Sequence, residues 1–561
     1  MIELSSESPQ HEVWQALDRV RGKFSTNEFG QGLAALVFLR WVDFQDAEQE
    51  AIAAFDDAEY RPVLPHKYHW RNWHNAYQNV KKEVFKELPG FLTTLSNSRN
   101  DNLATQLHLI APAVETLSRF PIDAIESLIR WLAAQPFETP NDRRVLRDRL
   151  DEMTRKLVDK QTAQYFTPRD VVETMVAVAE PKFGESVYDP CFGSAGMLTS
   201  AADYVRENDE TNARSGKPLL ELSGVELFAE NYVIGLTRLA LSGVDSPQLE
   251  LGNSLERTGP NSPSKDGFDL VLMNPPWGAK VDAYGLDHYP IPSKDAVSLF
   301  IQHALAQLRP TGRAIAVVPQ GNLFRGGREQ SLREMLLREH TVEAVVTLPS
   351  SVFASYAAIT ASIIVFRKGG TTKSVRMVDL SNEKLGKSKP TDEFIATVVE
   401  LVRTPYPQDK AWDVDFKTLE EYDFDLTPKR RNQSSLEEII RGFDAQVEMW
   451  PLREVARISN GKTVPGKDLI DEPISAKEEM LSAQELASEV LQLQKQLELN
   501  DRNESIEEIE QKQNRESFKD QIERLTKLID NRNEFDDYEI PYIRIKDVAN
   551  CLLYTSPSPR D

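Results

Sequence analysis

Apolar residues recur with helical spacing through the first 150 residues of the chain. One helical face is outlined by Phe29, Leu33, Leu36, Phe38, Leu39 and Trp41, and another by Ile122, Ile125, Leu128, Ile129 and Leu132. The alternation of apolar and polar residues that is typical of strands does not occur here over any length. The pattern therefore predicts an all-helical N-terminal domain over residues 1–150.

Residues 151–390 show a different pattern, in which short apolar runs alternate with helical periods. The short runs lie at 186–188, 222–225, 270–273, 314–318, 342–346 and 361–366. Such alternation is typical of βαβ units and a mainly parallel sheet. We expect an α/β fold of the Rossmann-like type over residues 151–432, with the polar, mixed stretch 390–445 packed against the sheet.

The C-terminal part contains two heptad-like runs within residues 475–535. Their apolar positions step by four and three residues, at Leu486, Val490, Leu493 and Leu497, and again at Phe518, Ile522, Leu525 and Ile529. The stretch 500–503 between the runs favours a turn. An antiparallel helical hairpin is the favoured interpretation, and a single solvated, charged helix is the alternative.

The charge of the chain is −22 over 561 residues, which is unfavourable for contact with nucleic acid. Residues 471–540 hold 20 acidic and 9 basic side chains, so half of this charge lies in one segment. Composition alone does not suggest DNA, but it does not exclude DNA either.

The location expected from composition is the cytoplasm. Two cysteines, Cys191 and Cys551, cannot form a disulfide framework, and a reducing compartment fits them. No apolar run is long enough for a membrane span, and the first residues lack the pattern of a signal peptide.

The first chemical motif is a strand followed by a glycine-containing turn and a helix, at residues 187–198. Glycines allow a ligand to approach the backbone closely, and free N–H groups at a helix start can hold a carboxylate. The acidic residue at the end of the strand could accept a hydrogen bond from an ammonium group. Together these features suit the methionine part of S-adenosylmethionine, through Asp189, Gly193, Ser194, Ala195 and Gly196. An ordinary strand-to-helix turn of an α/β domain is the alternative.

Two further strand ends and one upstream segment extend this cofactor site. Glu226 follows the second strand, where an acid can bind ribose hydroxyls, and Asn253 follows the third, where it could reach the adenine ring. Upstream, the sequence 164–170 predicts a helix with Thr167 as N-cap and Pro168 in the first turn. Its Tyr165-Phe166-Thr167 edge is expected to line the cofactor pocket.

The decisive motif is Asn274-Pro275-Pro276-Trp277 at the end of a buried strand. The prolines stiffen the backbone, so the side-chain carbonyl of Asn274 and the main-chain carbonyl of Pro275 become fixed acceptors. Two acceptors holding the hydrogens of an exocyclic amine favour a pyramidal nitrogen that can attack a methyl sulfonium without a strong base. Trp277 offers a face on which a planar group can stack. A simple proline turn after a strand is the alternative.

Through these motifs, most of residues 10–432 resemble the modification (methyltransferase) subunit of type I restriction–modification systems. The resemblance includes the helical stretch from Trp14 to Trp41, the sequence 164–169, the 189–196 loop, Glu226 and the 274–277 tetrapeptide. It continues at 298–303, 312–319, 348–353 and 422–426.

The resemblance implies S-adenosylmethionine as donor, double-stranded DNA as substrate, N6-methyladenine as product and no metal. It implies specificity and restriction subunits as partners, or self-association, and no membrane. Asn274 and Pro275 would hold N6, and Trp277 would stack on the flipped base. The residues implied in cofactor binding are Gln164, Tyr165, Phe166, Thr167, Pro168, Arg169, Ser194, Ala195, Gly196 and Glu226. Two positions depart from the family, because Asn253 stands where many relatives carry Asp and Ala195 lies between Ser and Gly.

Other enzymes also use Asn-Pro-Pro-aromatic motifs, so rival functions remain open at this point. Glutamine side-chain amides of proteins and N2 of guanine in ribosomal RNA are planar, delocalised nitrogens like adenine N6. A scaffold subunit with an inactive pocket is a non-enzymatic alternative. The N-terminal helical region and the C-terminal segment favour DNA.

From Trp450 the chain resembles the start of a target-recognition domain of a specificity subunit. We expect a partial domain of this kind at 446–550, into which the helical segment 475–535 is inserted. The last eleven residues, 551–561, resemble the translation of a sequencing-library adapter, so the natural protein is expected to continue differently beyond Asn550.

Overall fold

The structure is a computed structural model that describes most of the first 430 residues. The described ranges are 10–74, 80–98, 102–157, 167–208, 219–244, 246–257, 264–282, 286–353, 360–383, 391–404 and 406–428. Contacts within the chain group Met1–Arg430 as one compact unit and Arg431–Asp561 as a second. The expectations for 446–550, for the helical insert at 475–535 and for the tail at 551–561 therefore lie outside the described residues.

The N-terminal region is helical, as the periodicity predicts. Its long helix α2 begins after Ser25, whose hydroxyl accepts the Glu28 N–H at 3.1 Å while the Glu28 carboxylate accepts the Ser25 N–H at 2.8 Å. This reciprocal capping satisfies two donors that the first turn leaves unpaired. The elements are α1 (Gln10–Val20), α2 (Thr26–Phe55), η1 (His66–Tyr68), α3 (Trp70–Trp73), α4 (Val80–Ser98), α5 (Asn102–Arg119), α6 (Ile122–Ala133) and α7 (Pro140–Leu157).

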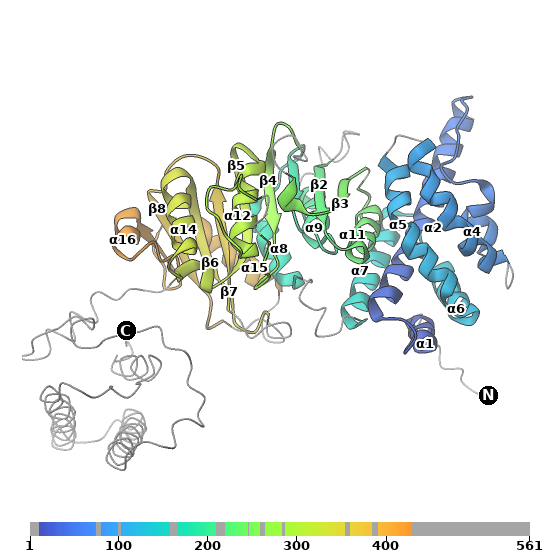
Figure 1. Ribbon diagram of the computed structural model, residues 1–561, viewed down its shortest axis with the longest axis horizontal. Coiled ribbons are helices and arrows are strands. Elements are labelled where there is room, and N and C mark those ends of the chain that lie inside the picture. The colour runs from blue at the N-terminus through green and yellow to red at the C-terminus, as the bar shows by residue number, and fades with distance from the viewer. Residues whose placement is uncertain are drawn as a thin grey trace, which may run out of the picture. The chain divides into compact units, whose positions relative to one another are not determined.

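The rest of the unit is built on a nine-stranded sheet with the order β3-β2-β1-β4-β5-β7-β6-β8-β9 (Figure 1). The first five strands in this order are mutually parallel, β7 is antiparallel to both neighbours, and β9 is antiparallel to β8. The strands are β1 (Ser186–Asp189), β2 (Glu221–Glu226), β3 (Gln248–Leu251), β4 (Phe268–Met273), β5 (Leu308–Pro319), β6 (Thr341–Thr347), β7 (Ala361–Arg367), β8 (Ser374–Asp379) and β9 (Ala411–Asp415).

Helices cover both faces of this sheet, and each face has its own hydrophobic cluster. Successive residues of a strand alternate between them: Val187 and Leu270 belong to one cluster, and Tyr188 and Val271 to the other. The first face packs α8 (Arg169–Ala179), α9 (Gly196–Asn208), α11 (Ala229–Leu241) and α15 (Thr391–Arg403). The second packs α12 (Ala296–Gln307) and α14 (Arg328–Glu339), and the short helices α13 (Gly321–Phe324), α16 (Phe416–Glu421) and η3 (Ser254–Glu256) complete the described elements.

The helical region shares a core with the sheet region. The first hydrophobic cluster runs from Val13 in α1 through α11 to the sheet, and Thr237 of α11 donates its hydroxyl to the Ala34 carbonyl of α2 at 3.1 Å. The boundary near residue 150 thus separates two kinds of secondary structure that pack as one body. As a division into domains it stays a prediction.

The six predicted apolar runs all form strands, but the sequence did not indicate β8 and β9. The centre of β8 holds a charged residue, Arg376, which is 5% exposed. Its guanidinium is satisfied by the carbonyls of Leu401 and Tyr406 and by Asp413. A buried arginine does not follow the apolar pattern that predicts strands. Among the described residues, no helix is long and apolar enough to cross a membrane.

Candidate active site

The polar residues singled out at the strand ends meet at one edge of the sheet. β1 ends at Asp189, β2 at Glu226 and β4 just before Asn274. These strands are parallel, and the register pairs Asp189 with Gly224, and Tyr188 with Val271. The strand order reverses between β1 and β4, and ligands of open α/β sheets bind outside the carboxyl ends at such a point.

The loop after β1 is held in an unusual backbone conformation. Gly193 and Ala195 both adopt left-handed conformations, with φ of 53° and 58°. The N–H of Gly193 donates to Oε2 of Glu226 at 2.9 Å, so the end of β2 fixes the loop that follows β1. A left-handed alanine costs free energy that the surrounding contacts must offset, and such strain concentrates at functional sites.

Two glycines outside this loop make room for its aromatic residue. A Cβ atom at Gly224 would lie 2.7 Å from Cδ1 of Phe192, and one at Gly235 would lie 2.8 Å from Cε2 of the same ring. Phe192 is 3% exposed, and it anchors the loop between β2 and α11. Gly196 is different, because a Cβ there would meet only Arg238 at 3.7 Å and Val172 at 3.8 Å, which are ordinary contacts.

A charged side chain of α11 forms hydrogen bonds with the loop that follows β1. Arg238 donates to the carbonyl of Ser194 at 2.6 Å and to its hydroxyl at 2.8 Å. The other guanidinium nitrogen donates to Asp151 of α7 at 2.5 Å. The helical region is therefore connected to the loop after β1 through one arginine, which the sequence pattern gave no reason to single out.

The two acids at this edge are buried and carry raised pKa values. Burial raises the pKa of Asp189 to about 7, while the Cys191 N–H that it accepts at 3.0 Å acts against this shift and the Glu226 charge adds to it. Burial also raises the pKa of Glu226, whose two oxygens accept N–H groups of Gly193 and Phe228. Burial keeps the pKa of the Cys191 thiol well above its usual range, so no thiolate nucleophile forms here. The acids can instead hold a cationic or hydroxyl-bearing ligand.

The tetrapeptide after β4 presents an acceptor without a partner. Nδ2 of Asn274 donates to the hydroxyl of Thr167 at 2.9 Å, which fixes the amide. Oδ1 of Asn274 is buried and accepts no hydrogen bond from the part of the chain that the structure describes. Buried acceptors are normally satisfied, so this atom is suited to a donor supplied by a ligand.

Thr167 is not the N-cap that its sequence predicts, and this prediction was wrong. Helix α8 begins at Arg169 with Pro168 in the cap position, and no side chain caps it. The Thr167 hydroxyl accepts from Asn274, which lies 107 residues away in sequence. The cause is tertiary, because the threonine serves the strand-end loop and not its own helix.

The aromatic residue of the tetrapeptide lies against a second ring. The ring centroids of Trp277 and Phe353 are 4.7 Å apart with an interplanar angle of 58°. Nε1 of Trp277 is buried and has no partner among the described residues. Pro275 is buried and Pro276 half-buried beside it. Phe353 comes from the segment after β6 and was not among the candidate site residues.

A buried hydrogen-bonded chain supports the same edge from the second face. Burial lowers the pKa of His303 to about 3, so its ring is neutral. Its nitrogens lie 3.1 Å from the hydroxyl of Tyr188 and 3.0 Å from that of Tyr289, which donates to the Leu255 carbonyl at 3.2 Å. Because Tyr289 donates onward, Nδ1 of His303 is the protonated nitrogen and Nε2 accepts from Tyr188. This chain connects the end of β1 to the turn after β3.

The remaining candidates differ in how far the structure places them. Asn253 lies at the same edge, but its amide accepts the Leu255 N–H at 3.2 Å and donates to Glu256 at 2.9 Å. Arg169 is exposed and pairs with Glu173 at 2.6 Å. Gln164, Tyr165 and Phe166 lie outside the described residues.

The sequence also gave no reason to single out Leu227 and Phe228. They follow Glu226 directly and are 60% and 42% exposed, which is unusual for large apolar side chains. Because they follow the end of β2, they place an apolar surface beside Glu226. A planar ring of a ligand could pack against this surface. Among the described residues, no cluster of His, Cys, Asp or Glu is arranged to hold a metal ion.

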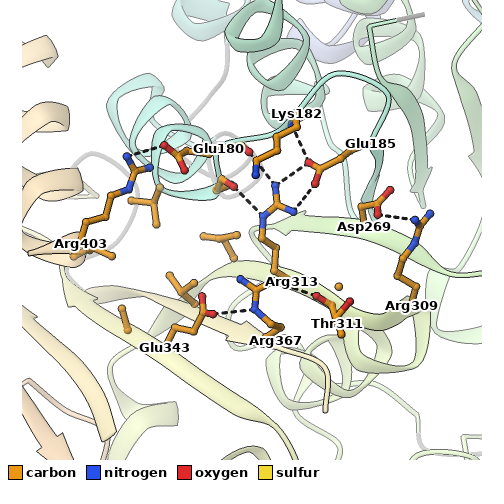
Figure 2. Close-up of a pocket in the computed structure, with 17 residues that line it drawn as sticks. Glu180, Lys182, Glu185, Asp269, Arg309, Thr311, Arg313, Glu343, Arg367 and Arg403 are labelled. Atoms are coloured by element: carbon orange, nitrogen blue, oxygen red, sulfur yellow. Dashed lines mark hydrogen bonds and ion pairs between the residues drawn. The ribbon is translucent and has the colours of Figure 1, made fainter. Parts of the chain in front are cut away.

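A cavity of about 560 Å³ lies at the opposite edge of the sheet, where β4, β5 and β6 begin (Figure 2). Its arginines are paired with carboxylates: Arg313 binds both oxygens of Glu185 at 2.8 Å, and Arg309 lies 2.7 Å from Asp269. Arg313 also donates to the carbonyls at the C-terminal end of α8. These contacts hold α8 against β5, and the cavity is separate from the candidate site.

Comparison with known proteins identifies the family. Residues 150–438 match the model of the N-6 DNA Methylase family, and residues 10–116 match that of the HsdM N-terminal domain. The chain belongs to the N-6 DNA methylase family.

Two of the similar proteins are methylase subunits of type I restriction enzymes. The chain is 26% identical to the type I restriction enzyme EcoEI methylase subunit of Escherichia coli over 472 residues, which covers 77% of this chain and 93% of the relative. It is 24% identical to the EcoKI methylase subunit of Escherichia coli K12 over 409 residues, or 68% and 74% of the two chains.

Solved structures of this group share the fold. A chain from a study of complex assembly and conformational transition of the type I restriction–modification system matches with a TM-score of 0.62 and 25% identity, over 87% of this chain and 99% of that one. The type I methyltransferase subunit from Streptococcus thermophilus matches with a TM-score of 0.56 and 22% identity, over 76% and 98%. The expected Rossmann-like methyltransferase fold with a helical N-terminal region is thus confirmed.

Proposed function

We propose that this chain is the modification subunit of a type I restriction–modification system, which transfers a methyl group from S-adenosylmethionine to N6 of adenine in double-stranded DNA. The family and the named relatives support DNA over a glutamine amide or guanine N2. The observation that carries the chemistry is the buried Oδ1 of Asn274, which has no partner in the described part of the chain, while Nδ2 of the same amide donates to Thr167.

The residues at the carboxyl edge fit the methyl donor. The Asp189 carboxylate would accept from the ammonium of its methionine part, Glu226 would accept from ribose hydroxyls, and Leu227 and Phe228 would contact the adenine ring. Gly196, at the start of α9, leaves the space for close approach. The bound donor supplies an electrophilic methyl group on a sulfonium.

The target amine would be held by Asn274 and Pro275. Their oxygens accept the two N6 hydrogens, so the nitrogen becomes pyramidal and its lone pair points at the methyl carbon. A C–N bond forms, the C–S bond breaks with its electrons remaining on sulfur, and N6 then releases one proton to water. Trp277, with Phe353 against it, would stack on the base once it leaves the helix.

The partners follow from the same relatives. We infer that a specificity subunit provides or completes target recognition, and that a restriction subunit is needed for any cleavage. The division into a helical domain at 1–150 and a catalytic domain at 151–432 belongs to this proposal. So does a cytoplasmic location.

The test of this function is a comparison of methyl acceptors. The full chain, alone and with its specificity subunit, is incubated with labelled S-adenosylmethionine and either adenine-unmethylated genomic DNA, ribosomal RNA or a glutamine-containing protein. We expect label in the DNA alone, and nucleoside analysis should identify it as N6-methyladenine. Label in RNA or protein, or in another DNA base, would refute the proposal.

A further inference from the structure

Exposed basic side chains gather near the candidate active site, on segments that follow β4 and β5. Lys280 lies three residues after Trp277, and Lys294 lies just before α12. Arg325 and Arg328 follow the carboxyl end of β5, which pairs with β4, the strand that ends just before Asn274. All four side chains are exposed. Their segments therefore lie at the same edge of the sheet as the tetrapeptide.

Hydrogen bonds join these segments into one surface. The N–H of Val281 donates to the carbonyl of Lys294 at 2.9 Å, so the stretch after the tetrapeptide pairs with the stretch before α12. Asp295 caps α12 by accepting the Ser298 N–H, and the same oxygen accepts Nδ2 of Asn322 in α13 at 3.1 Å. We call Lys280, Lys294, Arg325 and Arg328 the basic rim.

The fold makes little use of the charges on the basic rim. In the described ranges, the side chains of Lys294, Arg325 and Arg328 have no ion pair or hydrogen bond, and Lys280 lies a loose 3.9 Å from Asp295. Arg328 is the first residue of α14, where the helix dipole disfavours a cation. The neighbouring acid, Glu329, acts on the guanidinium of Arg333.

The opposite edge of the sheet shows the contrast (Figure 2). There Arg309, Arg313, Arg367 and Arg403 each lie within 2.9 Å of a carboxylate oxygen. Lys182 and Lys373 at that opposite edge are also exposed and make no ion pair among the described residues, so what distinguishes the basic rim is its place beside the tetrapeptide. A polyanion that reaches the active site would supply the missing partners.

We propose that the basic rim binds the phosphates of the DNA strand on either side of the target adenine. This inference rests on the proposed function. A base that turns out of the duplex brings its flanking phosphates to the mouth of the pocket, and lysine and arginine bind them without reading sequence. The rim would position the strand, and the choice of site would be left to target recognition.

The test measures the salt dependence of DNA binding by the full chain. Two double variants, Arg325→Gln with Arg328→Gln and Lys280→Gln with Lys294→Gln, bind a fluorescein-labelled duplex of arbitrary sequence at increasing KCl. Each lost phosphate contact lowers the slope of log affinity against log salt by about 0.9, so each double variant should lose about 2. S-adenosylmethionine affinity should stay at the wild-type value.

A matched control comes from the opposite edge of the sheet. Lys182 and Lys373 are exposed there, before β1 and β8, and Lys182→Gln with Lys373→Gln removes the same charge. This control should keep the wild-type slope. Rim variants with an unchanged slope, or a slope lowered equally by the control, would overturn the inference. Wild-type protein that methylates no DNA would instead overturn the proposed function, and this is read from the wild type alone.

Discussion

At the scale of single residues, the site depends on how one amide is oriented. The Thr167 hydroxyl accepts a hydrogen bond from Nδ2 of Asn274, and this leaves Oδ1 buried and available. A side-chain amide can rotate about its last bond, so the partner on one side determines which atom faces the ligand. Thr167 is thus a positioning residue for Asn274.

Replacing Asn274 should separate methyl transfer from cofactor binding. We expect Asn274→Ala to lower the turnover rate by at least about 10²-fold, the usual loss when one preorganised polar contact to the reacting group is removed. The affinity for S-adenosylmethionine, measured by calorimetry, should not change. A folded variant that loses cofactor binding would contradict the assignment of Asn274 to the target amine.

Asp189 predicts a pH dependence of cofactor binding. Its pKa of about 7 means that the free protein holds a neutral carboxyl below that pH, and the proton must leave before the ammonium can be held. Affinity for S-adenosylmethionine should therefore rise with pH up to about 7, by up to about tenfold per unit, and then level off. Calorimetry from acid to neutral pH measures this, with Asp189→Asn expected to bind weakly and without the pH dependence. Equal pH profiles for the two proteins would exclude Asp189 as the titrating group.

At the scale of elements, the cofactor loop is formed by β1, β2 and α11 together. Glu226 fixes Gly193, Arg238 holds Ser194, and Phe192 fits where Gly224 and Gly235 leave space. The left-handed backbone at Ala195 is tolerated because these contacts fix both sides of it.

Two glycine-to-alanine variants distinguish a glycine that leaves room for the ligand from a glycine that leaves room for a side chain of the protein. Gly196→Ala meets no close protein atom, so it should fold normally and weaken S-adenosylmethionine binding about tenfold or more where the ligand approaches. Gly224→Ala would push against Phe192 and should lower the free energy of unfolding by about 1–3 kcal/mol. Thermal melting and calorimetry measure the pair, and full cofactor affinity in Gly196→Ala would contradict the site.

At the scale of the whole molecule, the helical region contacts the proposed active site although it carries none of the chemical motifs. Asp151 of α7 pairs with Arg238, which holds the cofactor loop, and both side chains are 14% exposed. The shared hydrophobic cluster between α2 and α11 brings them together. The two regions are therefore joined by an ion pair and a shared hydrophobic cluster as well as by the continuous chain.

Breaking this pair should affect stability and cofactor binding together. Asp151→Asn leaves a largely buried guanidinium without its carboxylate, which costs about 3 kcal/mol of unfolding free energy when such a pair is broken. We expect a severalfold weaker S-adenosylmethionine affinity at temperatures where the variant is still folded. Glu334→Gln, which removes an exposed pair with Arg338, is the control and should change neither quantity measurably. Unchanged cofactor affinity in a destabilised Asp151→Asn would show that the loop does not depend on α7.

The sequence by itself determined the fold class and the approximate position of the site. Apolar runs of strand length predicted six strands, because buried parallel strands must be apolar on both faces. The polar residues from Asp189 to Trp277 come directly after these predicted strands. Because parallel strands have their carboxyl ends at one edge of the sheet, the sequence also predicted that these residues lie close together. β8 was missed because its buried Arg376 is satisfied by carbonyls distant in sequence.

Only the tertiary structure decided which side chains form hydrogen bonds and ion pairs with one another. The sequence made Thr167 a helix cap, but its hydroxyl lies beside Asn274. No local pattern marks Arg238, Phe353 or the charges of the basic rim, because what each does depends on the groups that the fold brings near it. Local patterns report whether a residue is buried and in which element, whereas hydrogen bonds and charge pairs between distant segments exist only once the chain has folded.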